Sequence, residues 1–351
     1  MSILFAILLF SVLIFVHELG HFAAAKLSGV QVNEFSMFMG PAIWKKQVGE
    51  TLYAIRTIPI GGYCAMEGED EDTENPRSFQ KAAWWKRLII LLAGAAMNFL
   101  TGILIFAVLY MPVETISDPV INEFTDCCIF NNAEGLQIGD EILELDGEKV
   151  YIMSDISLLL GLDSDGIHDV VVLRNGEKLT FSNLPMGHTH LDENGEEYRH
   201  YGIVFGRERK AGFLDKLEYV WNITIDNVRN VKLSLRMLFT GQASIQDMTG
   251  VVGIVDLMAE TAEQSETTMG AILNMLYFGG FIAINLAVMN LLPIPALDGG
   301  RAVCLLITTV VEAVTKKKIN PKYEGYLHGA GMILLLLLMA VITFKDIWNL
   351  F

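Results

Sequence analysis

The chain has few basic residues for its size. Its 351 residues include 25 Lys and Arg against 41 Asp and Glu, which gives a formal net charge of −16. A nucleic-acid-binding protein needs a stripe of basic side chains to neutralise phosphates. We therefore expect no nucleic-acid partner. Cysteine is also scarce: there are four, and the adjacent pair Cys127-Cys128 cannot readily close on itself, so no disulfide framework is expected.

The first sixteen residues, Met1 to Val16, lack any charged side chain. A secretory signal peptide would begin with basic residues and end at an Ala-x-Ala site, and this run contains neither. We therefore expect this run to be a retained membrane helix. Hydrophobic residues make up 52% of the chain and charged residues only 19%, which argues against an ordinary soluble enzyme.

Four apolar stretches are long enough to cross a bilayer, which takes about 20 helical residues at about 1.5 Å each. They are Ile3–Ala25, Leu88–Val113, Ile272–Leu292 and Gly329–Ile347. Basic residues gather after the first and third stretches, so the positive-inside rule places those segments in the cytoplasm and both chain termini outside. The predicted fold is a polytopic α-helical membrane protein with about four transmembrane helices.

The motif His17-Glu18-Leu19-Gly20-His21 closes the first apolar run. Four residues apart on a helix, His17 and His21 project from one face, a spacing that suits two ligands of one tetrahedral zinc. Glu18 lies beside them as the candidate general base. Sixteen helical residues cover about 24 Å of an apolar layer about 30 Å thick. We therefore expect the histidines inside the membrane, toward its cytoplasmic side.

The third apolar run leads into an irregular segment, whose sequence from Asn290 to Arg301 is NLLPIPALDGGR. Its two prolines end the helix, and irregular backbone at membrane depth is tolerated only where it lines a cavity or is buried in protein. Asp298 is therefore the predicted third zinc ligand, which leaves one tetrahedral position for water. The expected topology places it on the same membrane side as His17 and His21.

Two features near the predicted site each allow two interpretations. The stretch Thr51–Cys64 alternates like a strand and is broken by Pro59 and Gly61-Gly62, which predicts a β-hairpin or small sheet. Its edge could pair with an extended substrate, or the hairpin could simply lie at the membrane interface. Asn98, a polar side chain inside the second apolar run, could bond a neighbouring helix or hold substrate backbone.

About 155 residues separate the second and third apolar runs, and the topology places them outside. A Gly-Leu-x-x-Gly-Asp turn begins at Gly135 and is followed by a strand, an Asp-Gly turn, a helical piece at 154–162 and two strands that flank Asn175-Gly176. This is the pattern of a PDZ domain. From Ala211 to Thr240, apolar residues recur at helical spacing, which predicts an amphipathic helix on the outer membrane surface that either guides substrate or only anchors.

These motifs together closely resemble the site-2 protease family of intramembrane zinc metalloproteases, and more narrowly its bacterial, PDZ-containing RseP-type members. The matching segments are HELGH, AGAAMNF in the second span, the PDZ pattern, and NLLPIPALDGGR. The resemblance implies zinc bound by His17, His21 and Asp298, with Glu18 as general acid and base. It also implies substrate binding by a set of residues near these ligands: Asn290, Pro293, Gly61, Gly62, Tyr63 and Asn98.

The resemblance further implies a bacterial cytoplasmic-membrane enzyme that cuts single-span membrane proteins within the lipid bilayer. Anti-sigma factors, remnant signal peptides and pheromone precursors are compatible substrates. An upstream site-1 protease would trim the substrate first, and the PDZ domain would act as a size filter.

The predicted organisation has eight segments. Residues 1–27 are the first transmembrane helix with the zinc motif, 28–85 a cytoplasmic-side loop with a membrane-associated β-hairpin, 86–113 the second transmembrane helix, 118–207 the extracytoplasmic PDZ domain (α+β), 211–270 an amphipathic region, 271–300 the third transmembrane helix with the Asp298 motif, 301–328 a cytoplasmic loop, and 329–348 the fourth transmembrane helix.

Two rival functions need different sequences. A membrane metal transporter or adaptor without protease activity should carry ionisable residues on several spans, but the interiors of the second and fourth runs have no charged residue. An inactive PDZ scaffold would have no need for an intact His-Glu-x-x-His motif.

Overall fold

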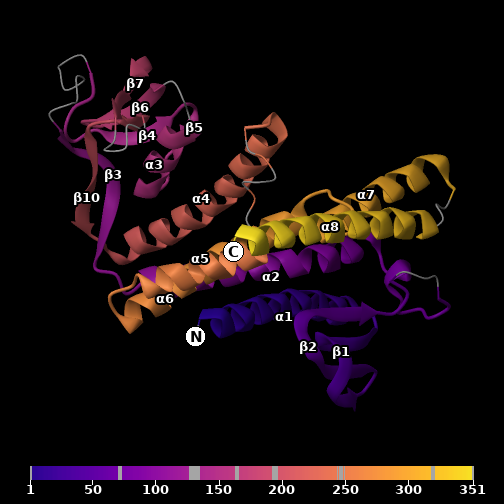
Figure 1. Cartoon of the computed structure of the whole chain (residues 1–351). Helices are drawn as coiled ribbons and strands as arrows, with labels where there is room; N and C mark the ends of the chain where they lie inside the picture. The colour runs from indigo at the N-terminus through magenta and orange to yellow at the C-terminus, as the bar shows by residue number, and fades with distance from the viewer. Residues whose placement is uncertain are drawn as a thin grey trace. The chain divides into compact units, whose positions relative to one another are not determined.

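The computed structural model describes residues 2–349 except 70–72, 126–134, 163–165, 192–196, 243, 245–247, 249 and 318–320. Cys127-Cys128 lies outside the described residues. The chain forms two compact units, shown in Figure 1. One unit combines Met1–Ile105 with Asn227–Phe351, and the other is Phe106–Asp226.

Four helices of the described chain are long and apolar enough to cross a membrane, which confirms the predicted polytopic helical fold. They are α1 (Ser2–Ser28), α2 (Trp84–Tyr110), α6 (Thr268–Leu291) and α8 (Pro321–Asn349). The prediction that 301–328 is a loop is wrong. Helix α7 (Asp298–Thr315) occupies most of it, because Ala302 and Leu305 lie on one helical face and are buried there.

The segment after the predicted PDZ domain divides into two different helices. Helix α4 (Phe213–Thr240) matches the predicted amphipathic helix. Helix α5 (Val251–Glu263) was expected to belong to the same surface region, but Met258 is fully buried in a cluster with residues of α1 and α6. Ile254 and Val255 pack against the same cluster, so α5 has an apolar face at helical spacing. Thirteen residues are too few to span a bilayer, and α5 packs against the bundle through this face.

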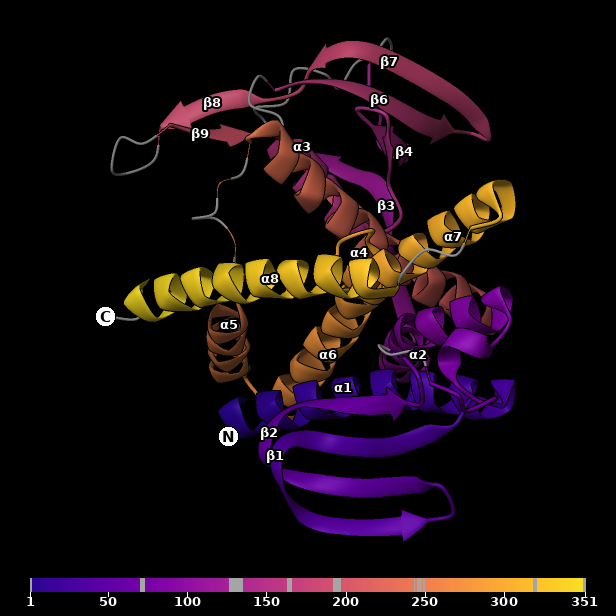
Figure 2. The same cartoon turned by 90° about the vertical axis from the view of Figure 1, so that its right-hand side faces the viewer.

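Strands β1 (Val32–Val48) and β2 (Thr51–Met66) form a sheet that is larger than a plain hairpin (Figure 2). Phe35 pairs with Cys64 on one side and with Tyr53 on the other. The first half of β1 thus lies between the two halves of β2, and Lys45, in its second half, pairs with Ala54. The last residues of β2 are left at one edge of this sheet.

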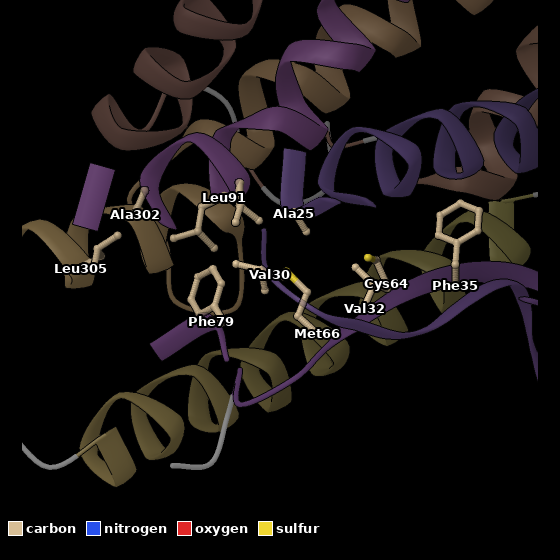
Figure 3. Packing of buried hydrophobic residues seen from close by; sticks show 11 residues of the cluster. Ala25, Val30, Val32, Phe35, Cys64, Met66, Phe79, Leu91, Ala302 and Leu305 are labelled. Atoms are coloured by element: carbon tan, nitrogen blue, oxygen red, sulfur yellow. The ribbon is translucent and has the colours of Figure 1, made fainter. Parts of the chain in front are cut away.

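A core cluster joins this sheet to the helices (Figure 3). It includes Phe35 and Cys64 from the sheet, Ala25 from α1, Leu91 from α2 and Leu305 from α7. Burying one side chain of the size of Phe or Leu contributes roughly 1.5–3 kcal/mol. The ring of Phe35 also lies 5.6 Å from that of Phe15 and 4.9 Å from that of Phe22, both on α1. The end of β2 is thereby fixed beside the zinc motif of α1.

The second unit contains a sheet in the order β10-β3-β4-β6-β7, with β5 beside β4, and a separate β8–β9 pair; all these pairings are antiparallel. The elements are β3 (Thr115–Phe124), β4 (Glu141–Leu145), β5 (Glu148–Lys149), α3 (Met153–Leu162), β6 (Ile167–Arg174), β7 (Glu177–Pro185), β8 (His188–Leu191), β9 (Glu197–His200) and β10 (Ile203–Lys210). Asn175 and Gly176 both have positive φ, 51° and 84°, as a two-residue hairpin turn requires. This is the PDZ-like α+β domain that the sequence indicates.

The buried Asp140 carboxylate stabilises the first turn of that domain. Asp140 is 1% exposed and accepts hydrogen bonds from Arg174 Nε and Nη2, each at 2.7 Å. It also accepts one from the backbone N–H of Gln137, which closes the Gly-Asp turn. A buried carboxylate is tolerated when it is paired and hydrogen-bonded in this way.

Glu50 ties the β1–β2 turn to the rest of the first unit. It accepts hydrogen bonds from Arg77 at 2.5 and 2.9 Å and from Lys26 at 2.6 Å. These donors lower the pKa of the Glu50 carboxyl from 4.5 to about 2, Arg77 having the larger effect. A lowered pKa in the folded state means that the ionised carboxylate stabilises the fold above its unfolded pKa. That stabilisation is lost as pH falls through the window from 4.5 to about 2.

We therefore expect Glu50→Gln to lower the thermal unfolding midpoint at pH 7. The difference from the unsubstituted protein should shrink as pH falls from 4.5 toward 2, because Glu50 then takes up a proton in the unfolded chain while the folded protein still holds it ionised. Thermal unfolding of the two proteins in the same detergent, measured in parallel between pH 3 and pH 7, tests this. A difference that stays constant over this range would contradict it.

Candidate metal centre

Helix α1 presents three functional side chains in its second half. His17 and His21 lie one turn apart, and their Nε2 atoms are 3.2 Å from each other. Both rings point to the same side of α1, as the spacing predicts. Glu18 follows His17 directly and lines the same cavity as the two histidines.

Asp298 joins them as the first residue of α7. Its Oδ2 lies 3.1 Å from His17 Nε2 and 3.3 Å from His21 Nε2. Two glycines allow the chain to deliver Asp298 there. A methyl group at Gly299 would lie 2.3 Å from the Leu291 carbonyl, and one at Gly300 would lie 2.2 Å from the Ile294 carbonyl oxygen. Helix α7 can therefore begin directly against the backbone that leaves α6.

The hydrogen bonds around His21 show which of its nitrogens carries the proton. Its Nδ1 lies 2.8 Å from the carbonyl oxygen of Ile90, and a carbonyl can only accept. The proton of a neutral imidazole is therefore on Nδ1, and the Nε2 lone pair faces Asp298. Asp298 Oδ2 is itself buried and has no hydrogen-bond donor among the described residues. Electron-rich atoms that face one another in this way are suited to hold a cation.

The separations of the three atoms fit a tetrahedral zinc. Zinc–nitrogen and zinc–oxygen bonds are about 2.0–2.2 Å, so two ligand atoms of a tetrahedral site lie about 3.3–3.5 Å apart. The three observed separations are 3.1, 3.2 and 3.3 Å. His17, His21 and Asp298 are the group of potential metal-binding side chains found among the described residues. Three ligands leave one position for water, as in catalytic zinc sites.

Asn98 of α2 completes the surroundings of His17. It is 1% exposed, and its side-chain amide lies 3.4 Å from His17 Nδ1. The amide oxygen is buried and has no partner, but a half-turn about χ2 exchanges it with the nitrogen. The oxygen can then accept from Nδ1–H and leave Nε2 for a metal. Asn98 therefore contacts a neighbouring helix, and its role in substrate binding stays a prediction.

Close packing of α1 and α2 keeps the two histidines in place. A methyl group at Gly94 would lie 2.4 Å from His21 Nε2 and 2.7 Å from His17 Cε1. A methyl group at Gly20 would lie 2.4 Å from the Ala93 carbonyl oxygen. Neither glycine can take a side chain without moving the site.

A cavity of about 730 Å³ opens at these residues. The end of β2, from Tyr63 to Met66, forms one wall, and the start of the following segment extends it to Glu69. Gly62 lies close by, since a methyl group there would be 3.5 Å from Glu18 Cγ. Leu91, Arg301 and Met332 also line the cavity.

The other predicted substrate residues lie outside the cavity lining. Asn290 is half-buried in the last turn of α6, Pro293 is exposed just after it, and Gly61 packs against Met39. The Ile90 carbonyl could not be predicted, because it has no side-chain signal. The small residues of Ala93–Ala96 predict close helix contact, and Gly94 lies in such a contact.

Comparison with known proteins identifies the family. The model of peptidase family M50 matches residues 5–338. The chain belongs to this family, the site-2 proteases. It is therefore a zinc metalloprotease, and with its four candidate spans it is a multi-pass membrane protein.

Individual relatives match over their full length. A protein of Fusobacterium nucleatum, assigned as a zinc metalloprotease, is 35% identical over 100% of both chains. A Clostridium perfringens protein with the same assignment is 33% identical over 99% of this chain and 98% of the relative. The regulator of sigma-W protease RasP of Bacillus subtilis is 29% identical over 98% of both chains.

The packing at Gly94 leads to a first test of the site. In Gly94→Ala the added methyl group must displace the two imidazoles, so the purified protein should retain much less than one zinc per chain. Gly102→Ala is the matched control, because the nearest atoms to the new methyl group on the same helix belong to the Ile284 side chain and the Gly280 carbonyl and not to the histidines. Metal analysis of both variants checks this. Full zinc content in Gly94→Ala would contradict this expectation, because it would show that α1 and α2 can move apart without loss of the site.

Asn98 gives a second test. Asn98→Asp keeps an oxygen that can accept from His17 Nδ1–H, whereas Asn98→Leu removes it. Loss of such a partner typically lowers metal affinity about 10–100-fold. We expect this loss in Asn98→Leu and a smaller one in Asn98→Asp, measured by competition with a zinc chelator. Equal affinities in the two variants would exclude a role of the acceptor.

Proposed function

We propose that this protein is an endopeptidase that cleaves the membrane-spanning segments of single-span proteins, with His17, His21 and Asp298 as zinc ligands. The observation that carries this proposal is the meeting of the three ligand atoms, at 3.1–3.3 Å, on helices of a membrane bundle. The cavity beside them contains Glu18 and is walled by a strand.

Glu18 is the proposed general base and acid. Bound zinc would lower the pKa of its water to about 7 and polarise the scissile carbonyl. The Glu18 carboxylate accepts the proton of the attacking water and then donates it to the leaving amine. Asn98 and the Ile90 carbonyl hold the histidines with their Nδ1 protons in place during both steps. Tyr63 and Arg301 line the space in which the peptide group must fit.

The edge of β2 is the proposed binding site for substrate backbone. Gly62 and Cys64 pair with Met37 and Phe35 of β1 on one side, and no pairing on the other side is found among the described strands. A membrane helix hides its peptide bonds, so a substrate must unwind before it can be cut. Pairing with the β2 edge would satisfy the released N–H and C=O groups. For Asn290 and Pro293, the family resemblance alone supports a substrate contact.

The substrates, orientation and partners are also part of the proposal. Basic residues after α1 and around α7 support a site near the cytoplasmic side of a bacterial membrane, with both termini and the PDZ-like domain outside. The name of the Bacillus subtilis relative, regulator of sigma-W protease, supports a regulatory role in sigma-factor control. Anti-sigma factors as substrates rest on the family resemblance. Remnant signal peptides and pheromone precursors fit the same chemistry. An upstream site-1 protease and size filtering by the PDZ-like domain rest on the family resemblance.

The deciding experiment is cleavage of a single-span substrate by the purified chain in lipid vesicles. Glu18→Gln should abolish cleavage, a loss of at least about 100-fold from removing a general base, while zinc stays bound. Glu123→Gln, exposed on β3, serves as the control. Cleavage by Glu18→Gln at the rate of the unsubstituted protein would contradict the mechanism. Loss of cleavage with zinc retained also argues against a transporter, whose metal site needs no general base.

A further inference from the structure

Only a few residues of helix α8 contact the loop between α6 and α7, which leads to Asp298. None of the eighteen residues of its most apolar stretch is buried, so α8 is largely peripheral to the bundle. Two polar residues near its start differ from their neighbours. The side chains of His328 and Glu324 are 14% and 23% exposed, whereas Tyr326 is 73% exposed. Polar groups turned inward from a peripheral membrane helix indicate a specific contact.

His328 makes that contact with the loop between α6 and α7. The backbone N–H of Ala296 donates a hydrogen bond to His328 Nδ1 at 2.9 Å. Ala296 has a φ of +80°, a left-handed conformation that is unfavourable for any residue with a side chain. Such a conformation persists only when the surroundings hold it. Ala296 stands two residues before Asp298, so its conformation sets the direction in which the chain enters α7.

A second contact from the same face of α8 holds the neighbouring loop residue. Gly331 lies three residues after His328, and a methyl group there would be 2.6 Å from Pro295 Cβ and 2.7 Å from its carbonyl oxygen. The backbone of α8 therefore packs directly against Pro295. His328 and Gly331 together fix two consecutive residues of the loop.

The hydrogen bond also defines the state of the imidazole. Because Nδ1 accepts from Ala296, a neutral His328 carries its proton on Nε2. Glu324 Oε1 lies 3.8 Å from that Nε2, one turn earlier on α8. This carboxylate favours a proton on Nε2 and keeps Nδ1 available as the acceptor.

We propose that His328 is a positioning residue of the metal centre. It holds Ala296 in its left-handed conformation and thereby brings the Asp298 carboxylate to the two histidines of α1. The inference rests on the proposed role of Asp298 as a zinc ligand. His328 touches neither substrate nor metal in this arrangement and acts through the backbone.

The test compares two substitutions that differ in one acceptor. His328→Leu removes the acceptor, whereas His328→Asn can place its amide oxygen where Nδ1 was. We expect His328→Leu to weaken zinc binding about 10–100-fold in chelator competition and His328→Asn to restore most of it. The kcat for a reconstituted single-span substrate should fall with zinc affinity, while KM stays unchanged. Tyr326→Leu, exposed on the same helix, should change neither quantity.

Two outcomes would overturn the proposal. Zinc binding of unchanged affinity in His328→Leu would show that Asp298 is placed without the imidazole. Equal losses in His328→Leu and His328→Asn would show that the acceptor has no role and that only packing matters. Should His328→Leu not fold, Gly331→Ala provides the second variant. This variant keeps the imidazole, displaces Pro295 and is expected to weaken zinc binding. Unchanged zinc affinity would contradict the claim that the loop positions Asp298.

The readouts separate this inference from the proposed function. Zinc affinity is measured without substrate, so it tests the positioning role even if the chain cuts no membrane segment. If Glu18→Gln cleaves normally but His328→Leu binds zinc weakly, the mechanism fails and the positioning role stands. If the ligands themselves are misassigned, Asp298→Asn will leave zinc affinity unchanged, and the inference fails with them.

Discussion

Two imidazole nitrogens and one carboxylate oxygen lie 3.1–3.3 Å from one another inside an apolar bundle, and a bound cation relieves their mutual repulsion. The rest of the first unit is arranged around this constraint. The Ile90 carbonyl fixes the proton of His21 away from the centre. Asn98 can do the same for His17. Both acceptors come from α2, so α1 supplies the two imidazoles and its neighbour α2 determines which nitrogen of each carries the proton.

Four glycines allow backbone segments to pack closely around this centre. Gly20 and Gly94 let α1 and α2 touch, while Gly299 and Gly300 let α7 start against the end of α6. In a membrane, where burial of apolar surface gives no net drive for helix association, such close contacts supply much of the attraction between helices. The site therefore depends on contacts between main chains, which cannot be relieved by a change of rotamer.

Much of this could be predicted from the sequence, and the failures have physical causes. The spacing of His17 and His21 and the prolines before Asp298 predict the ligand set, because local helix geometry and the environment of the bilayer determine both. The turn at Asn175-Gly176 follows from its φ requirements in the same way. Helix α5 was not predicted as a separate element because its 13 residues are too short for a span, and only tertiary contact reveals that Met258 is buried. The double pairing of β1 and the carbonyl of Ile90 leave no periodic side-chain pattern, so no sequence rule finds them.

The sheet of β1 and β2 has two outer strands with opposite properties. The outer half of β1, from Ala42 to Val48, carries Lys45 and Lys46, both exposed. Lysines on an edge strand discourage pairing with another chain. The outer half of β2, from Thr57 to Met66, contains no charged residue and leads to the cavity. In such a sheet, lysines disfavour pairing with another chain at one edge, and the other edge carries no charge that would do so. Aggregation can therefore be suppressed without closing the edge beside Glu18.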